Sequence, residues 1–219
     1  MSTPAPGFGA AIALLVFLAA VCGPAAADSN TDPHAKHRQM MNEQSEPKAK
    51  ATRLEIPDVR LLNRNGVSVG LREDVIGDRI VVVDFVYTTC TTICPVLSAI
   101  LSQVQNRLGD RLGNDVVLVS LSVDPLRDTP QRLQAYSAKL RAGEGWIWLT
   151  GNKQTVDDVL RRFGAYTPSF EDHPSMILVG DGRSGEWSRF LGFPGAEKIM
   201  EKIGELDAAR GAQAAVREK

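Results

Sequence analysis

The stretch RIVVVDFVYTTCTTICPVLSAIL, residues 79–101, joins an apolar run to a segment with helical spacing and carries two cysteines at the junction. Residues 79–86 are mostly β-branched or aromatic, which predicts a strand covered on both faces. Apolar residues then recur at intervals of three and four as far as Leu108, and Gly109 is a typical stop, so a helix of about three to four turns is expected. A buried strand followed by a helix indicates an α/β fold.

The rest of the chain continues this alternation of strands and helices. Two short apolar-alternating runs flank Asn65-Gly66, which predicts a hairpin at the start of the domain because both residues tolerate positive φ. Further strands are predicted at 115–123, 146–150, 175–179 and 186–193, with helices starting at Pro130, capped by Thr155, and from 196 to 206. The prediction is an α/β fold with a mixed central β-sheet flanked by helices and an N-terminal β-hairpin.

Length and composition restrict the class of protein. The chain has 219 residues, 43% of them hydrophobic, and a net charge of -1. This length suits one domain with extensions, predicted here at residues 54–208. No basic surface is expected, so nucleic-acid binding is excluded, and three cysteines are too few for a disulfide-based scaffold.

The first 27 residues contain no charged side chain and include an apolar run at 10–21 followed by small residues. This predicts an export signal cleaved after Ala27, or a short anchor, since the run is shorter than the roughly 20 residues that span a bilayer. Cys22 lies inside this segment. Cys90 and Cys94 are therefore the cysteines of the predicted mature protein.

Residues 28–53 are polar and lack an apolar run, which predicts a disordered tether. A flexible C-terminal tail is predicted at 209–219. The tether carries two histidines and two methionines: His34, His37, Met40 and Met41. A solvated linker explains them without function, although these soft ligands could also help to collect copper.

Cys90 and Cys94 are four positions apart in the first turn of a predicted helix, so they share one face. The unpaired amides and the dipole at a helix start favour thiolate over thiol. A structural disulfide is one interpretation, but a ring of five residues restricts the unfolded chain little. Redox exchange and metal binding both remain open, with zinc disfavoured because no second cysteine or histidine pair completes four ligands.

His173 and Asp84 are the other candidate site residues. His173 precedes a predicted strand, and the ends of adjacent strands in an α/β sheet converge, so it can face the cysteines. Two thiolates and one imidazole would suit Cu(I), or Cu(II) with an added oxygen ligand. Asp84 lies within the apolar strand, where burial should raise its pKa and make it a candidate proton acceptor in thiol chemistry. A carboxylate paired within the sheet is the alternative.

Asp124 and Asp128 follow the next predicted strand. Asp124 could lie beside the site, but we expect turn-forming and capping roles for both residues rather than metal ligation.

Three motifs together resemble one known family. YTTCTTICP, then SLSVDPLRDTP, then a single histidine before the penultimate strand are similar to the Sco/SenC proteins, over about residues 54–206. The resemblance implies a thioredoxin-like fold, copper bound by Cys90, Cys94 and His173, and a periplasmic or membrane-tethered location. The offset of Asp84 from Cys90 also resembles the buried acid of thioredoxins. Thioredoxin folds place a cis-proline beside the cysteines, and the sequence leaves both the cis and the trans form of the His173-Pro174 bond open.

The resemblance implies a copper metallochaperone of the cell envelope that delivers copper to the copper A site of cytochrome c oxidase. The alternatives are a thiol-disulfide oxidoreductase that keeps the oxidase cysteines reduced, and a redox or copper sensor. Expected partners are the copper A subunit, another copper chaperone or a thioredoxin-like reductant, with membrane association through the N-terminus. A disulfide between Cys90 and Cys94 would abolish copper binding, so copper loading and redox state are expected to be coupled.

Overall fold

The computed structural model describes residues 49–217. The predicted export signal with Cys22, and the tether residues His34, His37, Met40 and Met41, lie outside the described residues.

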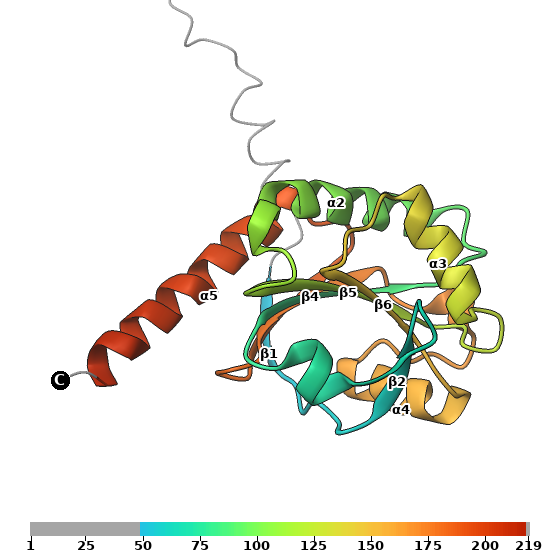
Figure 1. Ribbon diagram of the computed structural model, residues 1–219, viewed down its shortest axis with the longest axis horizontal. Helices are drawn as coiled ribbons and strands as arrows, with labels where there is room; N and C mark the ends of the chain where they lie inside the picture. The colour runs from blue at the N-terminus through green and yellow to red at the C-terminus, as the bar shows by residue number, and fades with distance from the viewer. Residues whose placement is uncertain (1–48, 218–219) are drawn as a thin grey trace, which may run out of the picture. The chain divides into compact units, whose positions relative to one another are not determined.

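The described chain forms an eight-stranded mixed sheet with helices on both faces (Figure 1). The strands are β1 (Lys50–Arg53), β2 (Arg60–Asn63), β3 (Ser68–Gly70), β4 (Ile80–Val86), β5 (Val116–Ser122), β6 (Trp146–Thr150), β7 (Met176–Asp181) and β8 (Glu186–Leu191). The helices are α2 (Ile93–Leu108), α3 (Pro130–Lys139), α4 (Lys153–Phe163) and α5 (Ala196–Arg217), with a short π-helix η1 (Leu71–Ile76) and two short 3-10 helices, η2 (Gly109–Arg111) and η3 (Phe170–Asp172). The spatial order is β1-β8-β7-β4-β5-β6-β2-β3. The predicted mixed sheet and N-terminal hairpin, which is β2 and β3, are confirmed.

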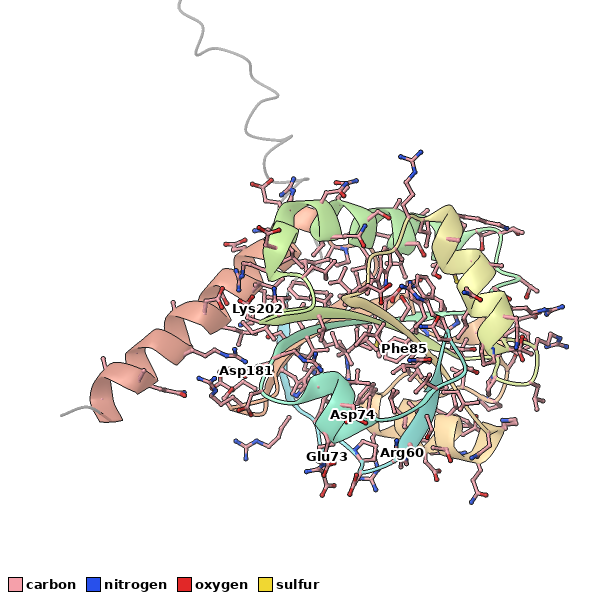
Figure 2. All side chains as sticks on the ribbon, viewed as in Figure 1. Arg60, Glu73, Asp74, Phe85, Asp181 and Lys202 are labelled. Atoms are coloured by element: carbon pink, nitrogen blue, oxygen red, sulfur yellow. The ribbon has the colours of Figure 1, made fainter. Side chains whose placement is uncertain are left out.

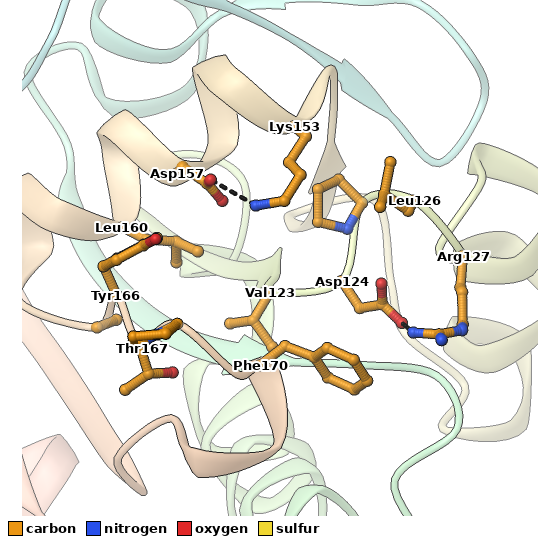
Figure 3. Close-up of a pocket in the computed structure, with 13 residues that line it drawn as sticks. Val123, Asp124, Leu126, Arg127, Lys153, Asp157, Leu160, Tyr166, Thr167 and Phe170 are labelled. Carbon is orange, nitrogen blue, oxygen red and sulfur yellow. Dashed lines mark hydrogen bonds and ion pairs between the residues drawn. The ribbon is translucent and has the colours of Figure 1, made fainter.

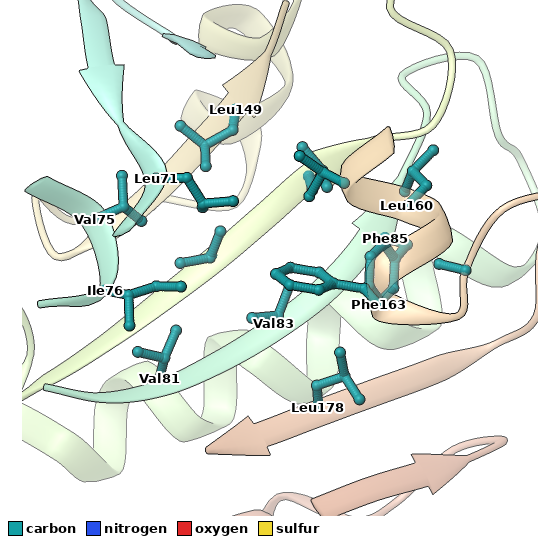
Figure 4. Packing of buried hydrophobic residues seen from close by; sticks show 14 of the residues in the cluster. Leu71, Val75, Ile76, Val81, Val83, Phe85, Leu149, Leu160, Phe163 and Leu178 are labelled. Atoms are coloured by element: carbon teal, nitrogen blue, oxygen red, sulfur yellow. The ribbon is translucent and has the colours of Figure 1, made fainter. Parts of the chain in front are cut away.

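Alternating residues of the central strand β4 pack into two separate cores. Val81, Val83 and Phe85 lie in the core beneath α4 and η1, and the ring of Phe85 meets Phe163 edge-on at a centroid distance of 6.2 Å (Figure 4). The neighbouring residues Ile80, Val82 and Val86 face the helices α2, α3 and α5. Burial on both faces explains the unbroken β-branched run of this strand.

The topology brings the loop before α2 and the loop before β7 to one edge of the sheet. Strand β4 is parallel to β5 and antiparallel to β7, with Asp84 opposite Ile177. The end of β4 therefore lies next to the beginning of β7. This is the convergence that the sequence predicted for the cysteines and His173.

The N-terminal boundary of the domain differs from the predicted one at residue 54. Residues 50–53, assigned to the tether, form β1, which pairs antiparallel with β8 from Lys50 opposite Arg189 to Arg53 opposite Glu186. These four residues carry no apolar run because they form an edge strand that is largely exposed. Backbone hydrogen bonding alone adds them to the sheet, so their pattern gave no strand signal.

Residues 209–217 of the predicted C-terminal tail are helical in the structure. Helix α5 continues to Arg217 instead of ending near 206. Arg210 donates from Nε to Oδ2 of Asp181 at 2.9 Å and from Nη2 to Oδ1 at 2.6 Å, and also to the Asp78 carbonyl. Asp181, at the end of β7, lies beside α5 in Figure 2. Leu206 is the last residue of α5 in the buried apolar core, and the ion pair between Arg210 and Asp181 stabilises the part of the helix that follows it.

Helix α4 also starts earlier than predicted. Asn152, rather than Thr155, is the N-cap, because its side chain accepts the Thr155 N–H at 2.8 Å. Among helices of the described residues, none combines the length and apolar character needed to cross a membrane.

Candidate metal centre

The loop between β4 and α2 brings the two cysteines together. Cys90 and Cys94 are both buried and both free thiols. The Cys94 N–H donates to the Sγ of Cys90 at 3.3 Å. The Thr92 side chain at the N-cap makes no capping bond. The Cys90 sulfur therefore accepts one of the amides that a helix start leaves unpaired.

The environment shifts the pKa values of the two thiols in opposite directions. Burial opposes ionisation of Cys90, but hydrogen bonds from Cys94, from the Thr92 backbone and from Tyr87 outweigh it and lower the pKa of Cys90 to about 6. Burial, followed by the hydrogen bond with Cys90, raises the pKa of Cys94 well above its ordinary value. Near neutral pH the pair therefore consists of a thiolate at Cys90 and a thiol at Cys94.

His173 offers one nitrogen with no hydrogen-bond partner. It follows the short 3-10 helix η3 and is 7% exposed. Its Nδ1 lies 2.7 Å from the Phe170 carbonyl, which can only accept, so Nδ1 carries the proton. The buried Nε2 has no partner in the structure. The peptide bond to Pro174 is trans, since the described residues contain no cis bond.

Tyr87 lies against both parts of the candidate site. Its ring meets Phe170 edge-on at 5.0 Å and His173 at 5.7 Å between centroids. Its side chain also hydrogen-bonds to Cys90, and this bond, followed by burial, raises the pKa of Tyr87 to about 12. The sequence reasoning missed Tyr87, although its position between the buried strand and the first cysteine was the available signal.

Within residues 49–217, no three His, Cys, Asp or Glu side chains lie close enough together to hold a metal ion. The structure brings Cys90 and Cys94 into contact and places His173 against Tyr87. It does not place the three predicted ligands in one coordination sphere. Metal binding by all three stays a prediction.

Asp84 is fully buried behind the cysteines. Burial raises its pKa to about 7, against the opposing hydrogen bond from Ser120. Ser120 Oγ donates to Oδ1 at 2.5 Å and itself accepts from Trp146 Nε1 at 2.9 Å, whereas Oδ2 has no partner. The charge of Asp84 contributes to the raised pKa of Cys94. These contacts suit the predicted role of a proton acceptor.

Asp124 and Asp128 lie in the turn after β5, as expected for turn-forming residues. The amides of Arg127 and Asp128 donate to the Asp124 carbonyl at 3.0 and 2.9 Å. Asp128 does not cap α3, because the N-cap is Thr129, whose side chain accepts the Arg132 N–H. The carboxylate of Asp128 instead accepts hydrogen bonds from Thr88 of the cysteine loop and from Ser122 at the end of β5.

Comparison with known proteins places this geometry in context. A protein of Stutzerimonas stutzeri named "Putative copper-binding protein" is 27% identical over 159 residues, covering 68% of this chain and 76% of the relative. The structure of BsSco, described as a member of the Sco family of cytochrome c oxidase assembly proteins, matches with a TM-score of 0.60 at 24% identity, over 72% of this chain and 96% of that one. Arabidopsis thaliana ScoI with copper bound matches with a TM-score of 0.59 at 22% identity, over 70% and 99%.

These likenesses confirm the predicted α/β, thioredoxin-like fold. The family model described as SCO1/SenC matches residues 47–205, which is most of the chain and includes strand β1. On this match, the chain belongs to the SCO1/SenC family.

Proposed function

We propose that this protein is a copper metallochaperone that binds one copper ion through Cys90, Cys94 and His173 and delivers it to the copper A site of cytochrome c oxidase. Family membership and the copper named in its relatives support the proposal. The observation that carries it is the buried Nε2 of His173, which has no partner while Nδ1 is fixed on Phe170. A neutral imidazole held in this way has one lone pair free for a metal.

The donor set fits copper as a cargo ion. Two sulfurs and one imidazole nitrogen are soft ligands of the kind that Cu(I) prefers. Binding through all three would require Cys90, Cys94 and His173 to come closer together than they lie in this structure. Ligand exchange with thiolates of the partner would release the ion.

Redox state would control loading. When Cys90 and Cys94 are oxidised to a disulfide, neither sulfur can carry the negative thiolate charge that binds copper. We also propose that the protein acts in the periplasm, free or tethered to the membrane, in keeping with the uncharged apolar segment predicted to direct export.

The test is a copper titration of the reduced protein, with His173→Ala as the variant and Ser175→Ala as the control in the same loop. Wild type should bind one Cu(I), and Cu(II) should give a sulfur-to-copper charge-transfer band. We expect His173→Ala to bind Cu(I) at least roughly tenfold more weakly, since outright loss of a ligand exceeds the 10- to 100-fold cost of losing a ligand's own partner. Ser175→Ala should bind as wild type. Absence of Cu(I) affinity in the wild type would rule the proposal out.

A thiol-disulfide oxidoreductase is the second candidate, favoured by the opposite pKa shifts of Cys90 and Cys94. The Cys90 thiolate would attack a partner disulfide, and Cys94 would then displace the partner, losing its proton as Asp84 accepts it. The partner's two sulfurs leave as thiolates with two electrons and take up protons from Asp84 and from solvent, and the Cys90–Cys94 pair becomes a disulfide. If oxidase assembly survives His173→Ala but fails with Cys90→Ser, this function replaces copper delivery.

A further inference from the structure

The turn after β5 lies between the two loops that carry the candidate site. Its backbone is fixed by two bonds to the Asp124 carbonyl, from the amides of Arg127 and Asp128. The side chains of Asp124 and Asp128 are both buried, at 4% and 1% exposed. Two carboxylates are thus held in the interior next to the site without being among its predicted ligands.

The Asp128 carboxylate is bound to the cysteine loop. It accepts the Thr88 N–H at 3.1 Å and the Thr88 hydroxyl at 2.6 Å, both at Oδ1. Its Oδ2 accepts the Ser122 hydroxyl at 2.7 Å. Thr88 is two residues before Cys90, whose amide closes a turn on the Tyr87 carbonyl at 3.1 Å. A buried carboxylate therefore fixes the backbone that leads into the first cysteine.

These bonds are not needed to start helix α3. Thr129 supplies the N-cap oxygen, and Pro130 occupies the first helical position. If Asp128 only served the helix, its carboxylate would point at the helix amides. Instead it ties the end of β5 to a loop that lies 40 residues earlier in the sequence.

The same turn also reaches the histidine loop. The Asp124 carboxylate accepts from Nη1 of Arg127 at 2.9 Å, and the Arg127 guanidinium lies over the Phe170 ring at 5.2 Å. Figure 3 shows Asp124, Arg127 and Phe170 at the border of a cavity of about 120 Å³. The carbonyl of Phe170 is the partner of His173 Nδ1. Arg127 is thus connected to His173 through one intervening residue, Phe170.

We propose that the turn Asp124–Asp128 positions both halves of the site: Asp128 holds the cysteine loop through Thr88, and Arg127 holds the histidine loop through Phe170. Both are positioning residues, since they act through another residue. The inference deepens the proposed function, because it rests on the cysteine pair and His173 being the working site.

The cysteine half is tested without copper. Reduced protein is equilibrated with oxidised and reduced dithiothreitol; Cys90 and Cys94 give two electrons to oxidised dithiothreitol and form a disulfide, while the dithiothreitol sulfurs take up protons from Cys94 and the buffer. The variants are Asp128→Ala and Thr88→Val. Thr88→Val removes only the hydroxyl donor, so the equilibrium can still be measured in this variant if Asp128→Ala does not fold. Asn152→Ala is the control, since it removes a helix cap on α4 and lowers stability without touching the site.

We expect the equilibrium to move toward the disulfide by roughly threefold or more in both variants, because the lost hydrogen bonds stabilise the dithiol arrangement. Asn152→Ala should leave it unchanged. If both variants lose stability but keep the wild-type equilibrium, or shift toward the dithiol, Asp128 does not position the cysteines.

The histidine half is tested with Arg127→Gln, by amide hydrogen exchange and the same equilibrium. We expect exchange in residues 166–173 to be at least roughly threefold faster, with the dithiothreitol equilibrium as in wild type, because the Arg127 side chain contacts Asp124 of its own turn and Phe170 of the histidine loop. Unchanged exchange would remove Arg127 from the proposal. Since no copper is used, failure of wild type to bind copper would overturn the proposed function and leave both results standing.

Discussion

At the scale of single residues, Tyr87 connects the cysteine and histidine sides of the site. Its hydroxyl stabilises the Cys90 thiolate, and its ring packs against His173. A hydrogen bond to a thiolate is charge-assisted and therefore stronger than one between neutral groups. One side chain, Tyr87, thus influences the reactivity of Cys90 and contacts His173.

Replacing Tyr87 by Phe should raise the pKa of Cys90, because the thiolate loses a donor while the ring contacts remain. Alkylation of Cys90 by iodoacetamide follows the thiolate population, with a midpoint near pH 6 in wild type. At pH 6 the variant should react roughly two- to fivefold more slowly, given a net hydrogen-bond contribution of about 1 kcal/mol. An unchanged midpoint would show that the hydroxyl does not act on Cys90, and Tyr166→Phe is the matched control.

At the scale of elements, helix α2 and helix α5 owe their ends to side chains rather than to apolar patterning. Cys90 takes the place of a conventional cap at the start of α2. Arg210 extends α5 by its ion pair with Asp181, and although burial opposes ionisation of Asp181, bonds from Arg210 and the Arg183 backbone lower its pKa. Both contacts join residues from different elements.

Substituting Arg210 by Ala should release the last turns of α5 and leave the Asp181 carboxylate without its main donor. We expect a loss of about 1–3 kcal/mol in the free energy of unfolding, measured by urea denaturation, because a buried acceptor loses its partner. Amide exchange should accelerate in residues 207–217. Gln213→Ala, on the exposed part of the same helix, should change neither quantity. A helix that stays protected without Arg210 would contradict this account of its length.

At the scale of the whole domain, sequence periodicity was sufficient for the central strands and the helices that cover them. It also predicted where the cysteine and histidine loops converge, because parallel and antiparallel neighbours of β4 follow from the alternation of elements. It could not predict β1, which has no apolar signal. Nor could it predict the contact of Asp128 with Thr88, since pairing over 40 residues depends on the finished fold.

The stability of the domain should depend on pH through Asp84. Its pKa is about 7 when folded, against an ordinary value of 3.8, so the folded state holds this proton more tightly than the unfolded state. The contribution is therefore fully present below about pH 4 and is lost as the pH rises through 7. The difference in unfolding free energy between wild type and Asp84→Asn should fall across this interval, by ~4 kcal/mol at most. A difference that is constant from pH 4 to 8 would show that Asp84 ionises normally.

The chain of hydrogen bonds from Trp146 through Ser120 to Asp84 has an optical consequence. The indole of Trp146 is fully buried, so its emission responds to nearby protein charges rather than to bulk water. A carboxylate that gains its charge two hydrogen bonds away changes the electric field across this ring. We therefore expect the emission wavelength of Trp146 to shift as Asp84 loses its proton.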